Sequence, residues 1–131
     1  MGEIIIDEQI SLIRSLIGQE NFDGAIRNCE KLIEEYPNNE LGYYYRALCF
    51  FAQDRIEDSI KNYAQALQIN PSFAKAYFNV GVSYFTLNYF DYALINFAKA
   101  LVLFVKSNEA NAKVRCINAL KVVENRKKSE F

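Results

Sequence analysis

The sequence predicts an all-α fold built from repeated helix pairs, and three observations lead to this prediction. Apolar residues recur along most of the chain at the three- and four-residue spacing of helices. One skeleton of apolar and small residues returns every 34 positions. Pro37 and Pro71 are also 34 residues apart, and each follows a predicted helix.

The composition agrees with this class. The chain has 131 residues, enough for one compact domain, and 51% of them are hydrophobic. Such a content makes disorder unfavourable. The five glycines and two prolines are sparse, which favours helices joined by short turns.

The first two predicted helices form a pair. The first runs from Asp7 to Gly18, and residues 19–21 are a polar break. The second begins at Asp23 and ends at Tyr36, because a proline disfavours the helical conformation of the residue before it. The first helix has apolar residues at helical spacing, namely Ile10, Ile13, Leu16 and Ile17.

The remaining pairs follow the same plan. The third helix is expected from Glu40 to Ala52 with Asn39 as its N-cap, and the fourth follows a turn at residues 53–55. Ser72 is the expected cap of the fifth helix. The sixth helix ends near residue 105, and a further helix covers residues 108–127. Its basic end suits the negative end of the helix dipole.

Nine columns of residues align when the chain is shifted by 34 positions. They are Pro37/Pro71, Ile13/Ala47/Gly81, Leu16/Phe50/Tyr84, Phe22/Ile56/Phe90, Ala25/Ser59/Ala93, Ile26/Ile60/Leu94, Cys29/Tyr63/Phe97, Leu32/Ala66/Ala100 and Ile33/Leu67/Leu101. This pattern, with Tyr43 and Tyr77 near the start of the first helix, resembles the tetratricopeptide repeat (TPR).

The resemblance implies a single domain folded as a right-handed α-α superhelix of about seven helices. The expected repeats are residues 6–39, 40–73 and 74–107, followed by a capping helix at 108–127. The first repeat departs from the family pattern at Gln9, Ile13 and Cys29, as an end unit often does. The alternative for the last helix is that it opens a fourth repeat.

The sequence offers no chemistry of an enzyme. It has no histidine, so a Ser-His-Asp or Cys-His arrangement cannot be built within the chain. Its glycines are isolated and form no phosphate-binding loop. The adjacent carboxylates of Glu34 and Glu35 cannot face each other on one helix. We therefore expect no catalytic, cofactor-binding or metal-binding residues, and we expect no cofactor.

Charge and cysteine content also limit the partners and the compartment. The net charge is −1 and no basic block occurs, so neither nucleic acid nor an anionic membrane is the expected partner. No apolar run reaches the length of a membrane span, and the N-terminus does not resemble a secretory signal. Cys29, Cys49 and Cys116 are expected to be reduced core residues of a cytoplasmic protein.

The resemblance implies that the first helix of each repeat lines a concave groove. Four aromatic residues outside the family's core positions recur in two columns, Tyr44/Phe78 and Phe51/Phe85. Rings excluded from a core expose apolar area, which marks a contact site. The alternative is that they pack between neighbouring helices. The expected groove residues are Arg14, Tyr44, Tyr45, Leu48, Phe51, Lys75, Phe78, Asn79, Val82 and Phe85.

The predicted function is a non-catalytic protein-protein interaction module, a scaffold or adaptor that binds a peptide segment of a partner in this groove. Asn79 would hydrogen-bond the peptide backbone, and Arg14 and Lys75 would favour an acidic flank. The clamp of co-chaperones for heat-shock proteins matches poorly, because only Lys75 fits it. Chaperones of secreted bacterial proteins fit more loosely, by groove character. The alternative function is homo-oligomerisation within a larger assembly.

Overall fold

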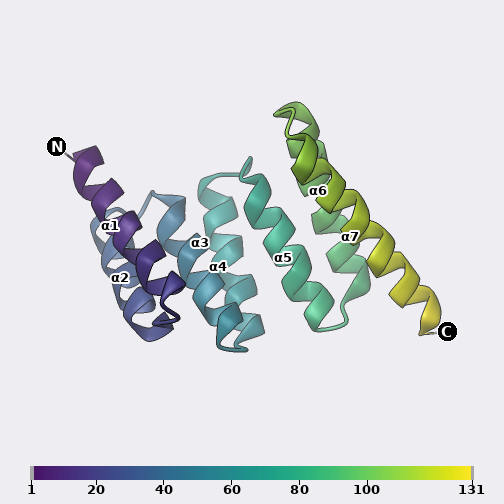
Figure 1. Cartoon of the computed structure of the whole chain (residues 1–131), viewed down its shortest axis with the longest axis horizontal. Coiled ribbons are helices and arrows are strands. Elements are labelled where there is room, and N and C mark those ends of the chain that lie inside the picture. Colours follow the sequence, from purple (N-terminus) through teal and green to yellow (C-terminus); the bar gives the residue numbers. More distant parts are fainter. Residues whose placement is uncertain (1, 131) are drawn as a thin grey trace. The chain divides into compact units, whose positions relative to one another are not determined.

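The computed structural model describes residues 2–130, with side chains from Ile5 onward. This part of the chain contains seven α-helices and no strand (Figure 1). Their bounds are α1 Gly2–Gly18, α2 Phe22–Glu35, α3 Glu40–Ala52, α4 Ile56–Ile69, α5 Ala74–Thr86, α6 Phe90–Lys106 and α7 Ala110–Ser129. No helix in this range is long and apolar enough to cross a membrane. The predicted all-α repeat class is confirmed.

Helix ends follow the local chemistry of the sequence. The Asn39 side chain accepts a hydrogen bond from the Leu41 N–H at 2.9 Å, so the predicted cap of α3 is confirmed. Asn21 caps α2 in the same way. The predicted cap at Ser72 is wrong, because the N-cap of α5 is Phe73. α1 begins five residues before the predicted Asp7, since the isoleucine run continues the helix.

The turns inside the helix pairs share one backbone geometry. Glu20, Asp54 and Asn88, spaced 34 residues apart, have φ angles of 59°, 61° and 65°. In the first turn the Asn21 N–H donates to the Leu16 carbonyl at 2.8 Å. This is the Schellman arrangement, in which a residue in the left-handed region ends a helix. Each helix pair therefore closes through a turn of three residues.

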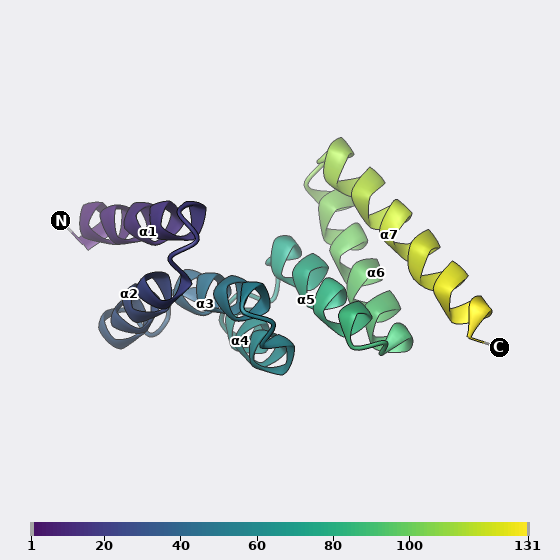
Figure 2. The ribbon, with the colours of Figure 1, turned by 60° about the horizontal axis from the view of Figure 1, so that its bottom comes forward.

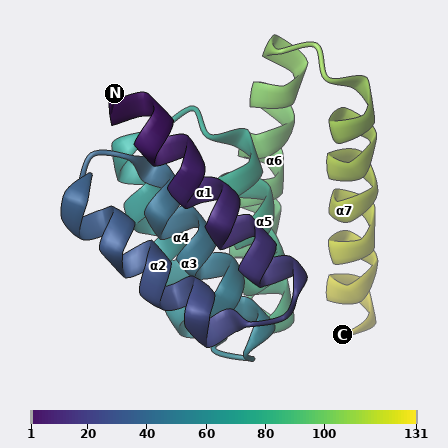
Figure 3. The same cartoon turned by 60° about the vertical axis from the view of Figure 1, so that its left-hand side comes forward.

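The connection between α6 and α7 repeats this geometry. Asn108 has a φ of 58°, and the Glu109 N–H donates to the Phe104 carbonyl at 3.1 Å. The turns after α2 and α4 are different, because they contain Pro37 and Pro71. α7 is thus joined to α6 as a pair partner, and it runs antiparallel beside α6 (Figures 2 and 3).

The chain divides into two compact units between Pro71 and Ser72. The N-terminal unit contains α1 to α4, and Figure 3 brings α1 and α2 to the front. Ile13, Cys29 and Leu32 form a fully buried cluster, against which Ile10 and Tyr45 pack. Arg46 Nε donates to the side-chain oxygen of Asn62 at 2.7 Å, which links α3 to α4.

The C-terminal unit contains α5, α6 and α7. One cluster joins Ala93 and Phe97 of α6 to Val123 of α7, and a second joins Ala100, Phe104 and Cys116. Gly81 of α5 faces the Phe97 ring, and an added Cβ would lie 2.8 Å from Cε1 of that ring. The absence of a side chain at Gly81 therefore permits the close approach of α5 to α6.

The three cysteines are buried and unpaired, as predicted. Burial raises the pKa of Cys29 to about 12, with a further contribution from the neighbouring Cys49. Burial likewise raises the pKa of Cys49 to about 11, and it raises the pKa of Cys116. A thiol with a raised pKa stays protonated at neutral pH, so these side chains act as core residues.

Candidate functional site

The ten predicted groove residues divide equally between the two units. The N-terminal unit carries Arg14 on α1, and α3 carries Tyr44, Tyr45, Leu48 and Phe51. The C-terminal unit carries the other five on α5, namely Lys75, Phe78, Asn79, Val82 and Phe85. Within each unit the expected contacts therefore come mainly from one helix.

On α3, Tyr44 differs from its expected exposure. Its side chain is only 8% exposed, and its ring meets those of Tyr63 and Tyr45 edge to face, with centroids 5.9 and 5.2 Å apart. Such contacts are favourable beyond the area that they bury. The prediction that this ring is excluded from the core is wrong. Tyr45, Leu48 and Phe51 are half-buried and keep surface for a partner.

On α5, Phe78 and Phe85 have one side toward the core of their unit. The Phe78 ring lies 5.1 Å from the Phe97 ring, and the Phe85 ring lies 5.8 Å from that of Phe90. Both residues are half-buried, like Asn79 and Val82 between them. The two rings were expected either to be exposed as a contact site or to pack between helices. They do both, since they pack on α6 and keep part of their surface open.

Two arginines of α7 cover these rings, a contact that was not predicted from the sequence. The Arg115 guanidinium carbon lies 4.9 Å from the centroid of Phe78, and that of Arg126 lies 5.5 Å from the centroid of Phe85. Both distances are those of cation–π contacts. One feature of the sequence could have indicated them: they are eleven residues apart, which places them on one side of a helix.

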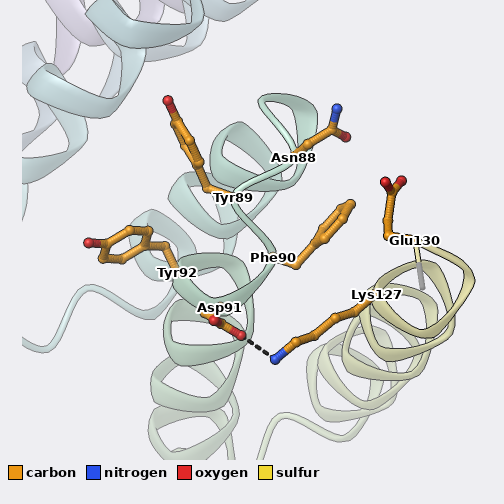
Figure 4. Close-up of a pocket in the computed structure, with 7 residues that line it drawn as sticks. All are labelled: Asn88, Tyr89, Phe90, Asp91, Tyr92, Lys127 and Glu130. Carbon is orange, nitrogen blue, oxygen red and sulfur yellow. Dashed lines mark hydrogen bonds and ion pairs between the residues drawn. The ribbon is translucent and has the colours of Figure 1, made fainter.

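A hollow of about 380 Å³ lies at the end of the C-terminal unit, where the turn into α6 meets the last turns of α7 (Figure 4). An ion pair joins Lys127 to Asp91 across it. Tyr89 and Tyr92 are 54% and 58% exposed at its rim. Its lining residues are Asn88, Tyr89, Phe90, Asp91, Tyr92, Lys127 and Glu130. The exposed rings of Tyr89 and Tyr92 give this hollow apolar contact surface.

The described side chains offer no group of three or more Cys, Asp or Glu residues arranged to hold a metal ion. Glu57 and Asp58 begin α4, and Asp58 pairs with Arg55 at 2.9 Å on the surface. Exposed pairs of this kind contribute little free energy.

Fold and surface together define an all-α repeat protein with aromatic side chains on successive first helices. Two family models agree with this class: "TPR repeat" matches residues 48–88, and "Tetratricopeptide repeat" matches residues 12–39. Together they cover more than half of the chain. The chain belongs to the tetratricopeptide repeat family.

A curated relative is the peroxisomal targeting signal receptor of Saccharomyces cerevisiae. The two are 32% identical over 77 residues, which is 57% of this chain. The match spans only 13% of the length of the receptor. The similarity thus concerns one segment of a much larger protein.

Solved structures share the fold over nearly the whole chain. The TPR2B domain of yeast Sti1 in its pHsp70 complex has a TM-score of 0.87 and 15% identity, covering 92% of this chain and 97% of that one. SycD of Yersinia enterocolitica with a YopD peptide has a TM-score of 0.86 and 13% identity, covering 94% of this chain and 95% of that one. PcrH with the chaperone binding region of PopD has a TM-score of 0.89 and 16% identity, covering 97% of this chain and 96% of that one. At these identities the similarity concerns the fold.

Proposed function

We propose that the chain is a non-catalytic protein-interaction module whose units each offer contacts to a peptide segment of a partner protein, the N-terminal unit from α3 and the C-terminal unit from α5. The apolar contacts come from Tyr45, Leu48 and Phe51 on α3 and from Phe78, Val82 and Phe85 on α5. Asn79 hydrogen-bonds the peptide backbone, and Arg14 and Lys75 flank the apolar contacts. The Tyr44 ring packs edge to face with that of Tyr45.

One observation carries this proposal. Leu48 and Val82 occupy one column of the 34-residue repeat, and Phe51 and Phe85 occupy another. All four side chains are apolar and half-buried, so the same positions of two repeats keep apolar surface open. Burial of such surface against a partner yields about 25 cal/mol per Å². Repetition of the feature at both columns favours a shared binding role over isolated surface variation.

The relatives support the same class of function. Sti1 is described in a complex with pHsp70, SycD with a peptide of the translocator YopD, and the yeast receptor as one for a targeting signal. Each description involves recognition of another protein. The three unpaired buried thiols support a cytoplasmic location, since oxidising compartments favour disulfides.

The proposal is tested with peptides selected from a random display library on the wild-type chain. The variant Leu48→Gln with Val82→Gln places polar amides at one groove column. We expect it to weaken binding of the selected peptides at least about tenfold, because each change removes roughly 1 kcal/mol or more of apolar contact. Fluorescence anisotropy gives the affinities, and circular dichroism verifies the helical fold.

The matched control makes the same two replacements elsewhere. Leu12 and Val114 are 48% and 55% exposed and lie outside the predicted groove positions. The variant Leu12→Gln with Val114→Gln should bind the peptides like the wild type. Equal binding by all three proteins, or no peptide selected at all, contradicts the proposal.

A second candidate function is homo-oligomerisation, which exposed apolar residues of α6 favour. Ile95, Val102 and Val105 are 49%, 53% and 54% exposed and share one side of the helix. Association through this side would bury them in a second copy. Sedimentation velocity over a micromolar concentration series tests this, and a monomer at every concentration rejects self-assembly as the main role.

A further inference from the structure

The two arginines of α7 that cover the rings of α5 lie on one side of their helix. Arg115 and Arg126 are separated by eleven residues, which is close to three helical turns. At 1.5 Å per residue, their Cα atoms are about 16 Å apart along the axis. α7 therefore presents two cations at a defined separation, next to the proposed contact residues of α5.

The rings hold the two guanidinium groups in place. The guanidinium carbons lie 4.9 Å from the Phe78 centroid and 5.5 Å from the Phe85 centroid. Contact with a ring uses the face of the planar group and leaves its N–H edges available. An N–H edge can bind a carboxylate with two parallel hydrogen bonds. The aromatic contacts thus orient the side chains and lower the entropy lost on binding.

No carboxylate among the described side chains, residues 5–130, forms an ion pair with Arg115 or Arg126; the three pairs found there involve Arg46, Arg55 and Lys127. The surrounding charge is also predominantly positive. α5 and α7 together contain seven basic residues, and Glu124 is their one acidic residue. An excess of one sign attracts a partner of the opposite sign and speeds its association.

From these contacts we propose that Arg115 and Arg126 are specificity-determining residues that bind two acidic side chains of the partner's peptide segment. The Cα atoms of the two arginines are about 16 Å apart, whereas the rings that hold their guanidinium groups are seven residues apart on α5, about 10 Å along its axis. These separations correspond to about three to five residues of an extended chain. Val82 lies on α5 between the two rings in sequence, so the intervening peptide residues are apolar. The occupant is an extended protein segment with two Asp or Glu residues about three to five positions apart. This inference rests on the proposed peptide-binding function and names its class of partner.

The test is a selection of random twelve-residue peptides on three versions of the full chain. These are the wild type, the variant Arg115→Gln with Arg126→Gln, and the control Lys121→Gln with Lys128→Gln. The control removes the same charge from exposed positions of the same helix. Lys121 and Lys128 project between a third and nearly half of a turn away from the two arginines.

We expect peptides enriched on the wild type and on the control to carry acidic pairs about three to five residues apart. The arginine variant should keep the apolar preference and lose the acidic pairs. For an enriched peptide, the affinity of the arginine variant should fall at least about tenfold, and its dependence on salt should become weaker. The variant Arg115→Lys with Arg126→Lys keeps the charge but loses the planar fork, so its affinity should be intermediate.

The outcomes separate the two proposals. Enriched peptides without acidic pairs, or equal loss of affinity in the arginine variant and the lysine control, overturn the role of the arginines and leave peptide binding intact. Failure of every version to enrich any peptide overturns the proposed function itself.

Discussion

The two units of this protein share one repeat skeleton but differ in charge and in the contacts that hold them. The N-terminal unit has six basic and twelve acidic residues, whereas the C-terminal unit has nine basic and four acidic ones. The net charge of −1 conceals this division. Two units with the same repeat skeleton thus carry net charges of opposite sign, so the repeat pattern does not determine the charge of the surface.

The stabilising contacts differ in the same way. In the N-terminal unit, Asn21 and Asn39 cap helices with their side chains, and Arg46 bonds to Asn62. In the C-terminal unit, the side chains of the N-cap residues of α5, α6 and α7 make no capping hydrogen bond to the first turn of their helices. Its rings instead meet one another and the arginines of α7. A common set of small and apolar columns therefore defines the fold, and the remaining contacts are specific to each unit.

We expect the greatest loss of stability from substitutions in one column of the repeat, which is occupied in both units. Phe97 is 3% exposed and contacts Gly81 and Phe78, whereas Cys29 fills the same column in the first repeat. Phe97→Ala should lower the free energy of unfolding by about 3–5 kcal/mol through the cavity that it leaves. Cys29→Ala removes one sulfur atom and should cost only about 1–2 kcal/mol.

Urea unfolding followed by circular dichroism measures both free energies. Phe97→Leu keeps most of the apolar volume and should lose clearly less than Phe97→Ala. Equal losses for Cys29→Ala and Phe97→Ala would show that the column contributes alike in both units.

The next effect concerns alkaline pH. The pKa of Cys29 rises from 9.0 in an unfolded chain to about 12, first through burial, and that of Cys49 rises to about 11. The folded state therefore keeps protons that the unfolded state releases as the pH rises above 9. Each thiol should lower the free energy of unfolding by about 1.4 kcal/mol per pH unit, from pH 9 up to its folded pKa.

Unfolding curves between pH 7 and 10.5 measure this slope. Below pH 9 the stabilisation by the protonated thiols is complete, so the curves there should not respond to these groups. Cys29→Ala should reduce the alkaline slope. An unchanged slope in that variant would assign the alkaline loss to other groups.

We expect the smallest changes in stability from glycine substitutions in the turns of the two units. The N-terminal unit places the acidic residues Glu20 and Asp54 in the left-handed region, whereas the C-terminal unit places Asn88 and Asn108 there. Asparagine tolerates this conformation better than glutamate. Glu20→Gly should therefore raise the stability by about 1 kcal/mol, and Asn88→Gly by about 0.5 kcal/mol or less.

Thermal unfolding detects these changes as shifts of a few degrees in Tm. Glu20→Ala is the control, because it removes the charge but keeps the Cβ that strains the turn. A gain in Glu20→Ala equal to that in Glu20→Gly would attribute the effect to charge.

The sequence was sufficient for most of the fold because its signals were local. Pro37 and Asn39 lie just before α3 and mark its start, so its predicted range, Glu40 to Ala52, matches the structure. The start of α1 was missed because the run before Asp7 lacks a capping residue and continues the helix. The cap at Ser72 was misplaced by one residue, since a serine before a helix does not by itself determine which residue precedes the first turn.

The candidate surface was harder to predict because it depends on contacts between helices. The 34-residue overlay placed Leu48 and Val82 in one column, and both are half-buried. It did not reveal that Tyr44 packs on Tyr63, because a ring beside the core column can turn inward when a second ring receives it. Arg115 and Arg126 were missed for a similar reason, as their contacts with α5 appear only in three dimensions.

The three-residue turns of this chain also bear on how fast it folds. Within each unit, helices pack mainly on the neighbours that precede and follow them in the chain, and no strand pairing occurs within residues 2–130. Contacts so close in sequence give a low contact order, for which folding times are on the order of microseconds to milliseconds. A repeat chain can also start folding at more than one position. The kinetics would show which unit forms its helix pairs first: the acidic one with capped helices or the basic one with stacked rings.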